Sequence, residues 1–252
     1  MPTTMPIDPL FDFTGKVALI TGGSRGLGYQ MARALAQRGA DVIIASRKLD
    51  ACEEVAAELR SLGHRALAVA AHAGRWADCD ALLDRAWGEF GHVDLLINNA
   101  GMSPACPSHE VSEALFDAVL NLNFKGPFRL ASQAGKRMAD GAGGAILNIS
   151  STASLNAVPG VVPYSGAKAA LNAMTVSLAR EYAPKVRVNA IIAGPFLTDI
   201  AEAWDARNRE VQPVALGRPG NPAEIVTAAL TLLSPASGYT TGALLQVDGG
   251  PR

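Results

Sequence analysis

Short apolar runs alternate with longer amphipathic segments along the whole chain, and this alternation predicts the architecture of the protein. The short runs are rich in valine, isoleucine and leucine and are apolar at consecutive positions, as in strands buried on both faces of a parallel sheet. We therefore predict strands at Val17–Thr21, Val42–Ser46, Ala66–Ala70, Val93–Ile97, Ala145–Ile149, Val186–Ile192 and Ala243–Val247.

The longer segments carry apolar residues at helical spacing, and Gly39, Gly63 and Gly91 stand where three of them should end in a C-terminal cap. We predict helices at Leu27–Arg38, Asp50–Leu62, Trp76–Phe90, Ser112–Ala139, Tyr164–Tyr182 and Pro222–Leu233. Strand–helix alternation of this kind indicates an α/β fold: a single-domain, Rossmann-like, doubly wound parallel sheet of about seven strands with helices on both faces.

The length of 252 residues suits one domain over residues 1–252 with a sizeable core. Residues 1–13 precede the first predicted strand, and we interpret them as a short N-terminal extension. The longest irregular stretch, residues 193–221, is large for a loop in a compact domain, which predicts a lid over a substrate site.

Composition narrows the classes of function. With 49% hydrophobic and 18% charged residues, the chain is globular and not disordered. A formal net charge of −1 argues against nucleic acid or an anionic membrane as a partner. No stretch is apolar enough to span a bilayer, and residues 1–13 do not resemble a signal peptide. The widely spaced Cys52, Cys79 and Cys106 fit a reducing compartment, so we expect a cytoplasmic protein without disulfides or a zinc site.

A glycine-rich turn joins the first predicted strand to the first predicted helix and reads Thr21-Gly-Gly-Ser-Arg-Gly-Leu-Gly28. Glycines allow the backbone to turn tightly and to approach a pyrophosphate at the helix N-terminus. This position between a strand and a helix predicts a dinucleotide site. The predicted contacts in the turn are Gly22, Ser24, Arg25, Gly26, Leu27 and Gly28.

The end of the second strand indicates which dinucleotide binds. An NAD site usually has an acidic residue here for the adenosine ribose, whereas this chain has Ser46 followed by Arg47. Arg47 and Arg25 are able to clamp a 2′-phosphate, and two such contacts of about 1.5–3 kcal/mol each favour NADP by roughly 10²-fold or more. We predict NADP(H) as the preferred cofactor, with NAD(H) as the alternative. In the other interpretation, Arg47 and Lys48 are ordinary solvated residues.

Tyr164 and Lys168 are spaced to share one face of a helix, thirteen and seventeen residues after Ser151. Lowering a tyrosine pKa from about 10 to about 7 takes roughly 4 kcal/mol, which one positive charge about 4 Å away supplies at an effective dielectric near 20. Such a tyrosine exchanges a proton with an alcohol oxygen near neutral pH. Taken alone, the pair is also explained as an exposed helical pair.

Four further motifs follow in order: Asn98-Asn-Ala-Gly101, Asn123-Phe-Lys-Gly126, Asn148-Ile-Ser-Ser151 and Val247-Asp-Gly-Gly250. Together with the glycine turn and Tyr-x-x-x-Lys, they resemble the motifs of the short-chain dehydrogenase/reductase family over roughly residues 14–250. Within that family the chain looks most like the NADP(H)-using carbonyl reductases and secondary-alcohol dehydrogenases.

The resemblance implies roles for individual residues. Tyr164 would be the general acid/base, and Lys168 would tune its pKa and anchor the nicotinamide ribose. Ser151 would orient the substrate oxygen, and Asn123 would hold a water that relays protons. Further implied cofactor contacts are Asn99, Ala100 and Gly101 along the adenosine, and Gly194, Phe196 and Thr198 around the nicotinamide carboxamide.

The chain departs from the family pattern at two places. His72 stands where the family usually has an aspartate near the adenine, and it either meets the adenine or is a plain structural histidine. After the sixth strand, Pro195 follows Gly194 where the family has proline before glycine, which leaves the carboxamide contacts open. The other histidines, His64, His92 and His109, lack the spacing of metal ligands, so we expect no metal.

The substrate is expected to be a small carbonyl compound or alcohol. The residues that would border it are mostly apolar and include no cluster of Arg or Lys for a carboxylate or phosphate, which favours a largely apolar molecule. These residues are Ser103, Leu155, Asn156, Val158, Phe196, Leu197 and Trp204.

The sequence thus predicts an NADP(H)-dependent oxidoreductase acting on a ketone or secondary alcohol. The alternatives are an NAD-dependent sugar or sugar-acid dehydrogenase and a non-catalytic nucleotide-sensing protein on the same fold. The family also implies a homotetramer or dimer, in which small residues such as Ala131, Gly135, Gly166 and Ala173 let long helices pack across a twofold axis. Equally, these residues let the helices approach their own sheet.

Pro127 lies four residues after Asn123 inside the predicted long helix. Proline has no N–H, so the Asn123 carbonyl loses its usual helical partner and the turn is pushed open. We predict a distorted helix at Asn123–Pro127 and an ordered water on the Asn123 carbonyl within reach of Lys168. In the simpler alternative, Pro127 only bends the helix around the core.

Overall fold

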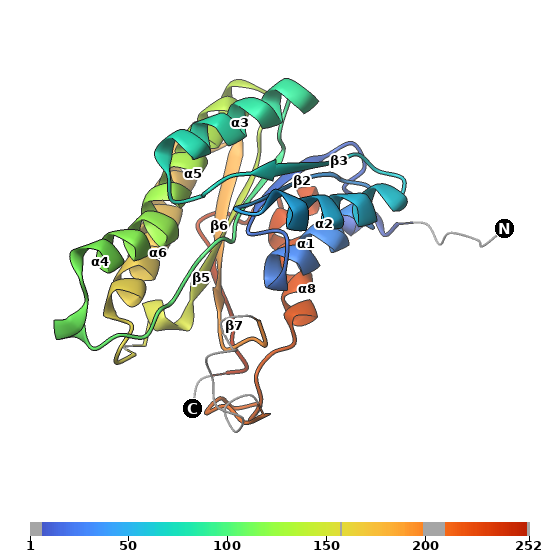
Figure 1. Cartoon of the computed structure of the whole chain (residues 1–252). Helices are drawn as coiled ribbons and strands as arrows, with labels where there is room; N and C mark the ends of the chain where they lie inside the picture. Colours follow the sequence, from blue (N-terminus) through green and yellow to red (C-terminus); the bar gives the residue numbers. More distant parts are fainter. Residues whose placement is uncertain (1–6, 157, 199–209, 251–252) are drawn as a thin grey trace.

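A seven-stranded parallel sheet forms the centre of the molecule (Figure 1). The computed structural model describes residues 7–156, 158–198 and 210–250. Across the sheet the strands run in the order β3-β2-β1-β4-β5-β6-β7, which confirms the predicted doubly wound fold. They are β1 Val17–Thr21, β2 Asp41–Ser46, β3 Ala66–Ala70, β4 Leu95–Asn98, β5 Gly144–Ser151, β6 Val186–Ala193 and β7 Leu244–Val247.

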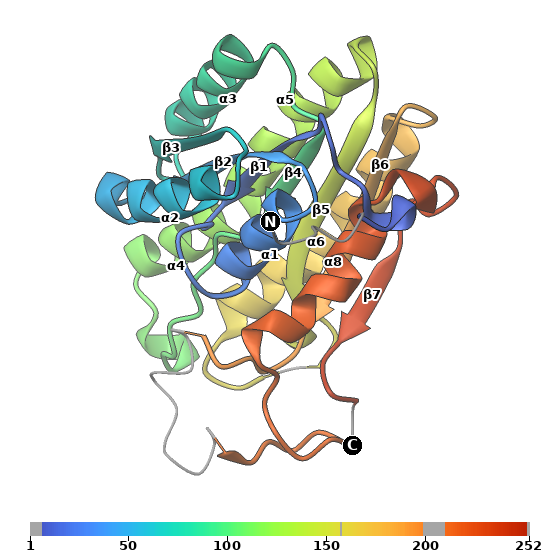
Figure 2. The ribbon, with the colours of Figure 1, turned by 90° about the vertical axis from the view of Figure 1, so that its right-hand side faces the viewer.

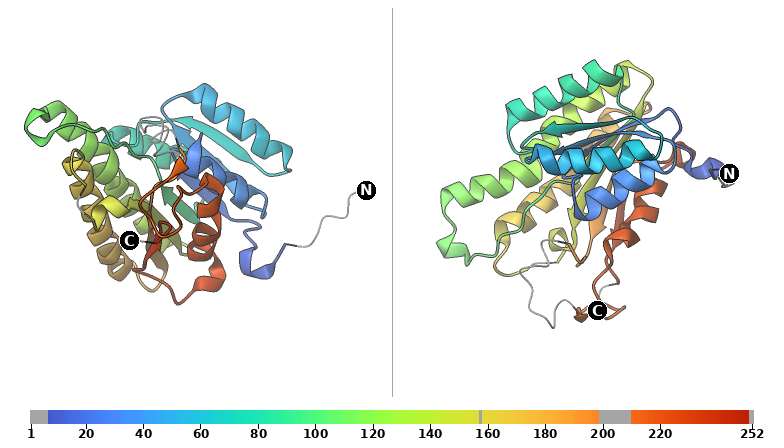
Figure 3. Two further views of the ribbon diagram at one scale, coloured as in Figure 1. Left: turned by 90° about the horizontal axis from the view of Figure 1, so that it is seen from below. Right: turned by 45° about the vertical axis from the view of Figure 1, so that its right-hand side comes forward.

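Helices bury both faces of this sheet. One layer consists of α1 Gly26–Ala36, α2 Leu49–Ser61 and α8 Val226–Leu233 (Figure 2). The other consists of α3 Trp76–Phe90, α5 Gly126–Asp140 and α6 Val162–Glu181, and α4 Glu113–Leu120 packs beside α6 (Figure 3). Within β1, Ala18 and Ile20 face the first layer while Val17 and Leu19 face the second, as expected for a strand buried on both sides. None of the described helices is both long enough and apolar enough to cross a membrane.

Strand β7 differs from the prediction that all strands are buried. Leu244 and Leu245 are 36% and 38% exposed. The reason is position: β7 pairs with β6 on one side and forms the edge of the sheet on the other. Its apolar sequence is therefore that of an edge strand whose faces are only partly covered.

The predicted helix over Ser112–Ala139 is not continuous. Between α4 and α5 the chain forms a π-helical turn at Asn121–Lys125, followed at once by Gly126 and Pro127. The predicted distortion at Asn123–Pro127 is confirmed. Close packing accompanies the distortion, because a Cβ on Gly126 would overlap the carbonyl oxygen of Ala73. Gly126 thus lets the π-helical turn approach the loop that follows β3.

The N-terminal segment is largely exposed where the structure describes it, but Phe13 belongs to the core. Phe13 is fully buried, and its N–H donates to the Arg38 carbonyl at 2.9 Å. A 3₁₀ turn at Pro9–Phe11 precedes it, and the Ser234 hydroxyl donates to the Leu10 carbonyl. The extension of residues 1–13 inferred from the sequence therefore contains at least one core residue.

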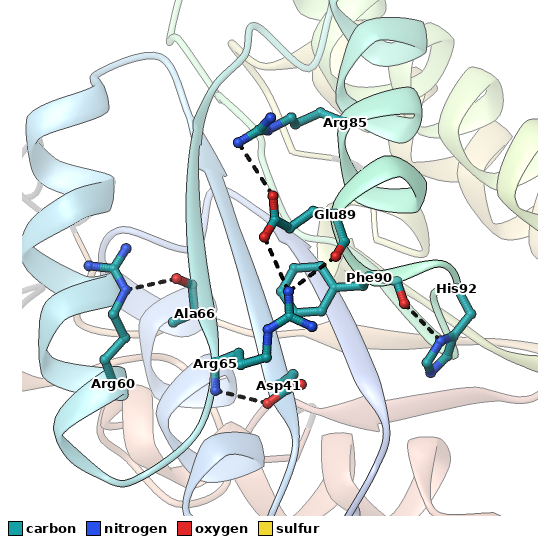
Figure 4. A network of polar contacts seen from close by, with 8 residues as sticks. All are labelled: Asp41, Arg60, Arg65, Ala66, Arg85, Glu89, Phe90 and His92. Carbon is teal, nitrogen blue, oxygen red and sulfur yellow. Dashed lines mark hydrogen bonds and ion pairs between the residues drawn. The ribbon is translucent and has the colours of Figure 1, made fainter.

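A charged cluster at the amino ends of the strands ties the sheet to α3 (Figure 4). The Arg65 guanidinium donates to the Glu89 carboxylate at 3.1 Å and lies 4.2 Å from the centre of the Phe90 ring. Its backbone N–H donates to Asp41 at 2.9 Å. These groups are largely exposed, so each ion pair stabilises the fold only slightly.

Gly126→Ala tests whether close contact at the π-helical turn holds the fold. We expect a loss of about 1–3 kcal/mol in the free energy of unfolding, because the added methyl group meets backbone that cannot move aside. Gly88→Ala, in the last turn of α3 with open space around its Cα, is the matched control and should be neutral or stabilising by up to about 1 kcal/mol. Urea unfolding of both variants measures the difference, and equal effects would contradict the packing argument.

Candidate active site

The sequence motifs gather at the carboxyl ends of the strands. The glycine turn follows β1, Asn98–Gly101 ends β4, and Ser151 ends β5. Parallel pairing of β1 with β4 and of β4 with β5 brings these ends to one edge of the sheet. Because β1 pairs with both β2 and β4, the strand order reverses beside β1, and open α/β sheets bind ligands at such a reversal.

The glycine turn has the geometry of a phosphate-binding loop. Gly22 and Gly26 have φ angles of 64° and 55°, which favour glycine, and α1 begins at Gly26. Side chains are excluded on the inner side, because a Cβ on Gly28 would overlap the Gly22 carbonyl oxygen. A backbone cradle at a helix N-terminus fits the pyrophosphate of a dinucleotide.

Asn99 takes a more specific place than the sequence predicted. Its Nδ2 donates to the carbonyls of Thr21 and Gly22, both at 3.0 Å, and its backbone N–H donates to the Thr21 hydroxyl at 3.1 Å. The side chain thus fastens the end of β4 to the glycine turn. Its direct contact with the cofactor remains a prediction.

Ser46 and Ser24 meet at the adenosine end of the predicted site. The Ser24 hydroxyl donates to that of Ser46 at 3.2 Å, and the Cys52 thiol lies 3.0 Å from the same Ser46 oxygen. Arg47, the next residue, is exposed. No sequence motif predicts the contact of Cys52 with Ser46, since only the packing of α2 on β2 brings the two side chains together.

A cleft of about 390 Å³ adjoins this end of the site, between the start of α1 and the outer side of α2. Its lining includes Arg25 but also the carboxylates of Glu54 and Glu58. The Glu58 carboxylate already accepts from Tyr29 at 2.8 Å and pairs with Arg33 at 3.2 Å, which compensates its charge. The cleft beside the glycine turn therefore contains both positive and negative side chains. The sequence around Ser46 and Arg47 predicted only the positive charge.

His72 is oriented by its own loop. Its Nδ1 accepts the Gly74 N–H at 3.1 Å, so a neutral ring carries its proton on Nε2. An aspartate at this position would present only acceptors, whereas His72 presents a donor. Its contact with adenine remains a prediction.

Tyr164, Ser151 and Lys168 come together as predicted. The Ser151 side chain is close enough to the Tyr164 hydroxyl to lower its pKa, and the Lys168 ammonium lies 5.7 Å from the centre of the Tyr164 ring. Lys168 is only 4% exposed and donates to the Ile149 carbonyl at 2.8 Å. The interpretation of Tyr164 and Lys168 as an exposed helical pair is therefore wrong.

The predicted effect of Lys168 on Tyr164 is not found. Burial raises the pKa of Tyr164, and the hydrogen bond from Ser151 opposes the rise. Burial also lowers the pKa of Lys168 to about 8. The estimate from the sequence assumed a well-solvated charge close to the phenol, whereas this ammonium is desolvated and directed at a backbone carbonyl.

Asn123 is fully buried in the π-helical turn and locks the loop after β4. Its Nδ2 donates to the carbonyls of Met102 at 2.9 Å and Val119 at 3.0 Å. Gly101 lies between Asn123 and Lys168, where a Cβ would be 2.9 Å from the Asn123 Oδ1 and 3.6 Å from the Lys168 Nζ. The water expected on the Asn123 carbonyl remains a prediction.

The residues predicted at the nicotinamide and substrate side are only partly brought together. Gly194 packs against Asp248, Thr198 lies beside Gly26, and the buried Phe196 ring packs on Gly220. Leu155, Asn156, Val158 and Leu197 are exposed, and Ser103 and Ala100 are partly exposed. Trp204 lies outside the described residues, together with the rest of the stretch 199–209 of the predicted lid.

A second pocket, of about 350 Å³, opens beside the start of α6. It is lined mainly by Val111, Phe116, Val162 and Pro163, with Ser108 and Glu113 at its polar side. The described residues include no group of acids, histidines and cysteines suited to a metal ion.

Comparison with known proteins agrees with this geometry. The family model described as short chain dehydrogenase matches residues 16–209. A 2-dehydro-3-deoxy-D-gluconate 5-dehydrogenase from Escherichia coli is 37% identical over 95% of this chain and 96% of the relative.

Two solved structures are also similar over almost their whole length. A 7α-hydroxysteroid dehydrogenase in complex with NADH and 7-oxo glycochenodeoxycholic acid has a TM-score of 0.92 and 32% identity, covering 98% of both chains. A blue fluorescent protein from a metagenomic library in complex with NADPH has a TM-score of 0.90 and 34% identity, covering 95% of this chain and 98% of that one.

Fold and site together define a dinucleotide-dependent oxidoreductase with a tyrosine, a serine and a lysine at its centre. The chain belongs to the short-chain dehydrogenase family.

Lys168→Met tests the burial of the ammonium group. A lysine whose folded pKa is about 8 and whose ordinary value is 10.5 destabilises the fold while it is charged, by about 3 kcal/mol, and this penalty fades as pH rises from about 8 to 10.5. We expect Lys168→Met to gain stability relative to the parent at pH 7, with the gain shrinking toward pH 10.

Urea unfolding at several pH values measures this trend. The lost hydrogen bond to Ile149 offsets part of the gain but does not change with pH. Lys125→Met, which removes an exposed ammonium, serves as the control and should show no such trend. A stability difference for Lys168→Met that is independent of pH would contradict the lowered pKa.

Proposed function

We propose that this protein transfers a hydride between NADP(H) and a ketone or secondary alcohol, with Tyr164 as the general acid/base. The observation that carries the proposal is the meeting of Ser151, Tyr164 and the buried Lys168, with the Lys168 ammonium 5.7 Å from the centre of the Tyr164 ring. A buried, desolvated lysine costs stability, and a site that only sensed nucleotides would not need it. The dinucleotide supplies or accepts the hydride when it is bound.

The residues divide the proton chemistry among them. A tyrosine with a raised pKa is protonated near neutral pH, so Tyr164 is ready to donate its proton to a carbonyl oxygen during reduction. Ser151 donates to the same oxygen and orients it. Lys168 holds the nicotinamide ribose, and Asn123 fixes the loop of Met102 and carries a water toward Lys168.

The cofactor preference rests on Ser46, Arg47 and Arg25. No acidic side chain occupies the end of β2, and Arg47 is exposed and able to reach a 2′-phosphate. Glu54 in the adjoining cleft weakens this preference, since its carboxylate repels phosphate. Remaining cofactor contacts are those predicted from the sequence, including His72, Gly194, Phe196 and Thr198.

A largely apolar carbonyl compound or alcohol is the proposed substrate class. The pocket of Val111, Phe116, Val162 and Pro163, which includes the residue before Tyr164 in the sequence but not Tyr164 itself, supports an apolar substrate. The Escherichia coli relative favours a second candidate, an NAD-dependent dehydrogenase of a sugar acid. A panel of ketones, sugar acids and polyols tested with both cofactors separates the two. We also propose a cytoplasmic homotetramer or dimer.

Tyr164→Phe tests the acid/base. We expect turnover to fall by about 10²–10⁴-fold while NADPH binding stays nearly unchanged, because only the exchangeable proton is removed. Steady-state kinetics and fluorescence titration of NADPH measure the two quantities. Tyr239→Phe is the matched control, since Tyr239 is fully exposed. Near-normal turnover in Tyr164→Phe would show that another group moves the proton.

Arg47→Glu tests the cofactor preference. The parent protein should bind NADPH more tightly than NADH at moderate ionic strength. The variant should lose or reverse this order, because a carboxylate repels the 2′-phosphate and accepts from a free 2′-hydroxyl. Arg180→Glu, at the far end of α6 from Tyr164, makes the same charge change and should leave the order intact. Equal affinities of the parent for NADPH and NADH would refute the preference.

A further inference from the structure

A turn of 3₁₀ helix at Thr152–Ser154 follows β5 and has Ser151 at its start. The Ser151 hydroxyl oxygen accepts the Ala153 N–H at 3.2 Å, and the Ser151 side chain lowers the pKa of Tyr164 against the effect of burial. Ser151 and Tyr164 belong to different elements, the end of β5 and the start of α6. The seating of this turn on α6 therefore fixes how Ser151 and Tyr164 meet.

Asn172 connects the turn to α6. Its Nδ2 donates to the Ser154 hydroxyl oxygen at 2.8 Å, and the Ser154 hydroxyl donates to the Ser151 carbonyl at 2.5 Å. Tyr164, Lys168 and Asn172 follow one another at intervals of four residues, so they lie on one face of α6. The same face of α6 therefore presents Tyr164 and Lys168 to the site and, through Asn172, binds the turn that follows Ser151.

The burial of Asn172 shows that this link is costly to keep. The side chain is 7% exposed, and its Oδ1 is buried without a partner among the described residues. A buried amide oxygen that lacks a hydrogen bond destabilises a fold, and an apolar residue of similar size would avoid the cost. The Asn172 amide makes one hydrogen bond that an apolar residue could not make, from Nδ2 to the Ser154 hydroxyl.

We propose that Asn172 is a positioning residue that acts through Ser154 to hold the Ser151 hydroxyl against the Tyr164 hydroxyl. The expected effect of Asn172 on turnover rests on the proposed function. The expected effect of Asn172 on the structure of the turn does not. Asn172 need not touch substrate or cofactor for this role. Nothing in the sequence motifs singles it out, because only the folded turn brings Ser154 to it.

The proposal has a consequence for proton transfer. Ser151 is the group that lowers the pKa of Tyr164 against the effect of burial. A loosened turn weakens that hydrogen bond, so the pKa of Tyr164 rises. Oxidation of an alcohol needs the deprotonated tyrosine, and its pH–rate profile then moves to higher pH.

The test compares Asn172→Leu, which keeps the volume of the side chain, with Ser165→Ala. Ser165 is the neighbour of Tyr164 on α6, and its buried hydroxyl has no partner among the described residues, so it is a matched control. Hydrogen exchange of the backbone amides at residues 152–156 is measured for both variants, and no substrate is required. We expect exchange about tenfold faster or more in Asn172→Leu, confined to this turn, and unchanged exchange in Ser165→Ala.

The second measurement is the pH dependence of kcat for the secondary alcohol that the panel selects. Asn172→Leu and Ser154→Ala should each shift the ascending limb, on the low-pH side of the profile, to higher pH with NADPH affinity unchanged, and the double variant should be no worse than either. Normal exchange at 152–156, or faster exchange with an unshifted profile, would overturn the proposal. Failure of the proposed function would be seen separately, as normal turnover in Tyr164→Phe or as no turnover of any compound in the panel. In either case the hydrogen-exchange measurement still tests whether Asn172 holds the turn at Thr152–Ser154 in place.

Discussion

The arrangement of the site depends on one buried charge. The Lys168 ammonium lies under the Tyr164 ring, and its described hydrogen bond is to the Ile149 carbonyl on β5. Burying an ammonium is expensive, so the groups around it must be fixed closely. Gly101 leaves room between the lysine and Asn123, and Gly126 lets the π-helical turn that carries Asn123 approach the loop after β3. Both glycines thus allow the backbone to pack closely in the region of this charge.

A buried polar chain supports the same region from below. Asn98 at the end of β4 donates to the Asn148 side chain on β5 at 2.9 Å, and Asn148 donates to the Thr175 hydroxyl on α6 at 2.9 Å. These side chains are almost fully buried, where hydrogen bonds are strong and unmet groups are costly. The chain therefore couples two strands of the sheet to the helix that carries Tyr164. It also explains why the asparagines of two different motifs act as one structural unit.

The cofactor end is built differently from the catalytic end. Asn99 fastens the glycine turn to β4, and small hydroxyl and thiol groups of Ser24, Ser46 and Cys52 fill the end of β2. Charged groups lie only at its rim, where Arg47 adds positive charge and Glu54 adds negative charge. Rim charges are screened by water and salt, so preference between dinucleotides depends on their balance more than on any single residue.

The sequence by itself determined the order of strands and helices, because apolar runs and helical periodicity are local properties of the chain. It also identified the glycine turn and the Tyr164–Lys168 pair, since a required spacing along one helix or turn can be read directly. It predicted the distorted helix at Asn123–Pro127 as well, from the position of Pro127. Only the tertiary structure decided the exposure of β7 and the links from Cys52 to Ser46 and from Asn172 to Ser154. The raised pKa of Tyr164 belongs with them, because burial opposes the effect expected from a nearby lysine. All of these features depend on which groups are buried next to one another. Residues far apart in the sequence become neighbours only when the sheet and its helices pack, so the sequence alone does not show them.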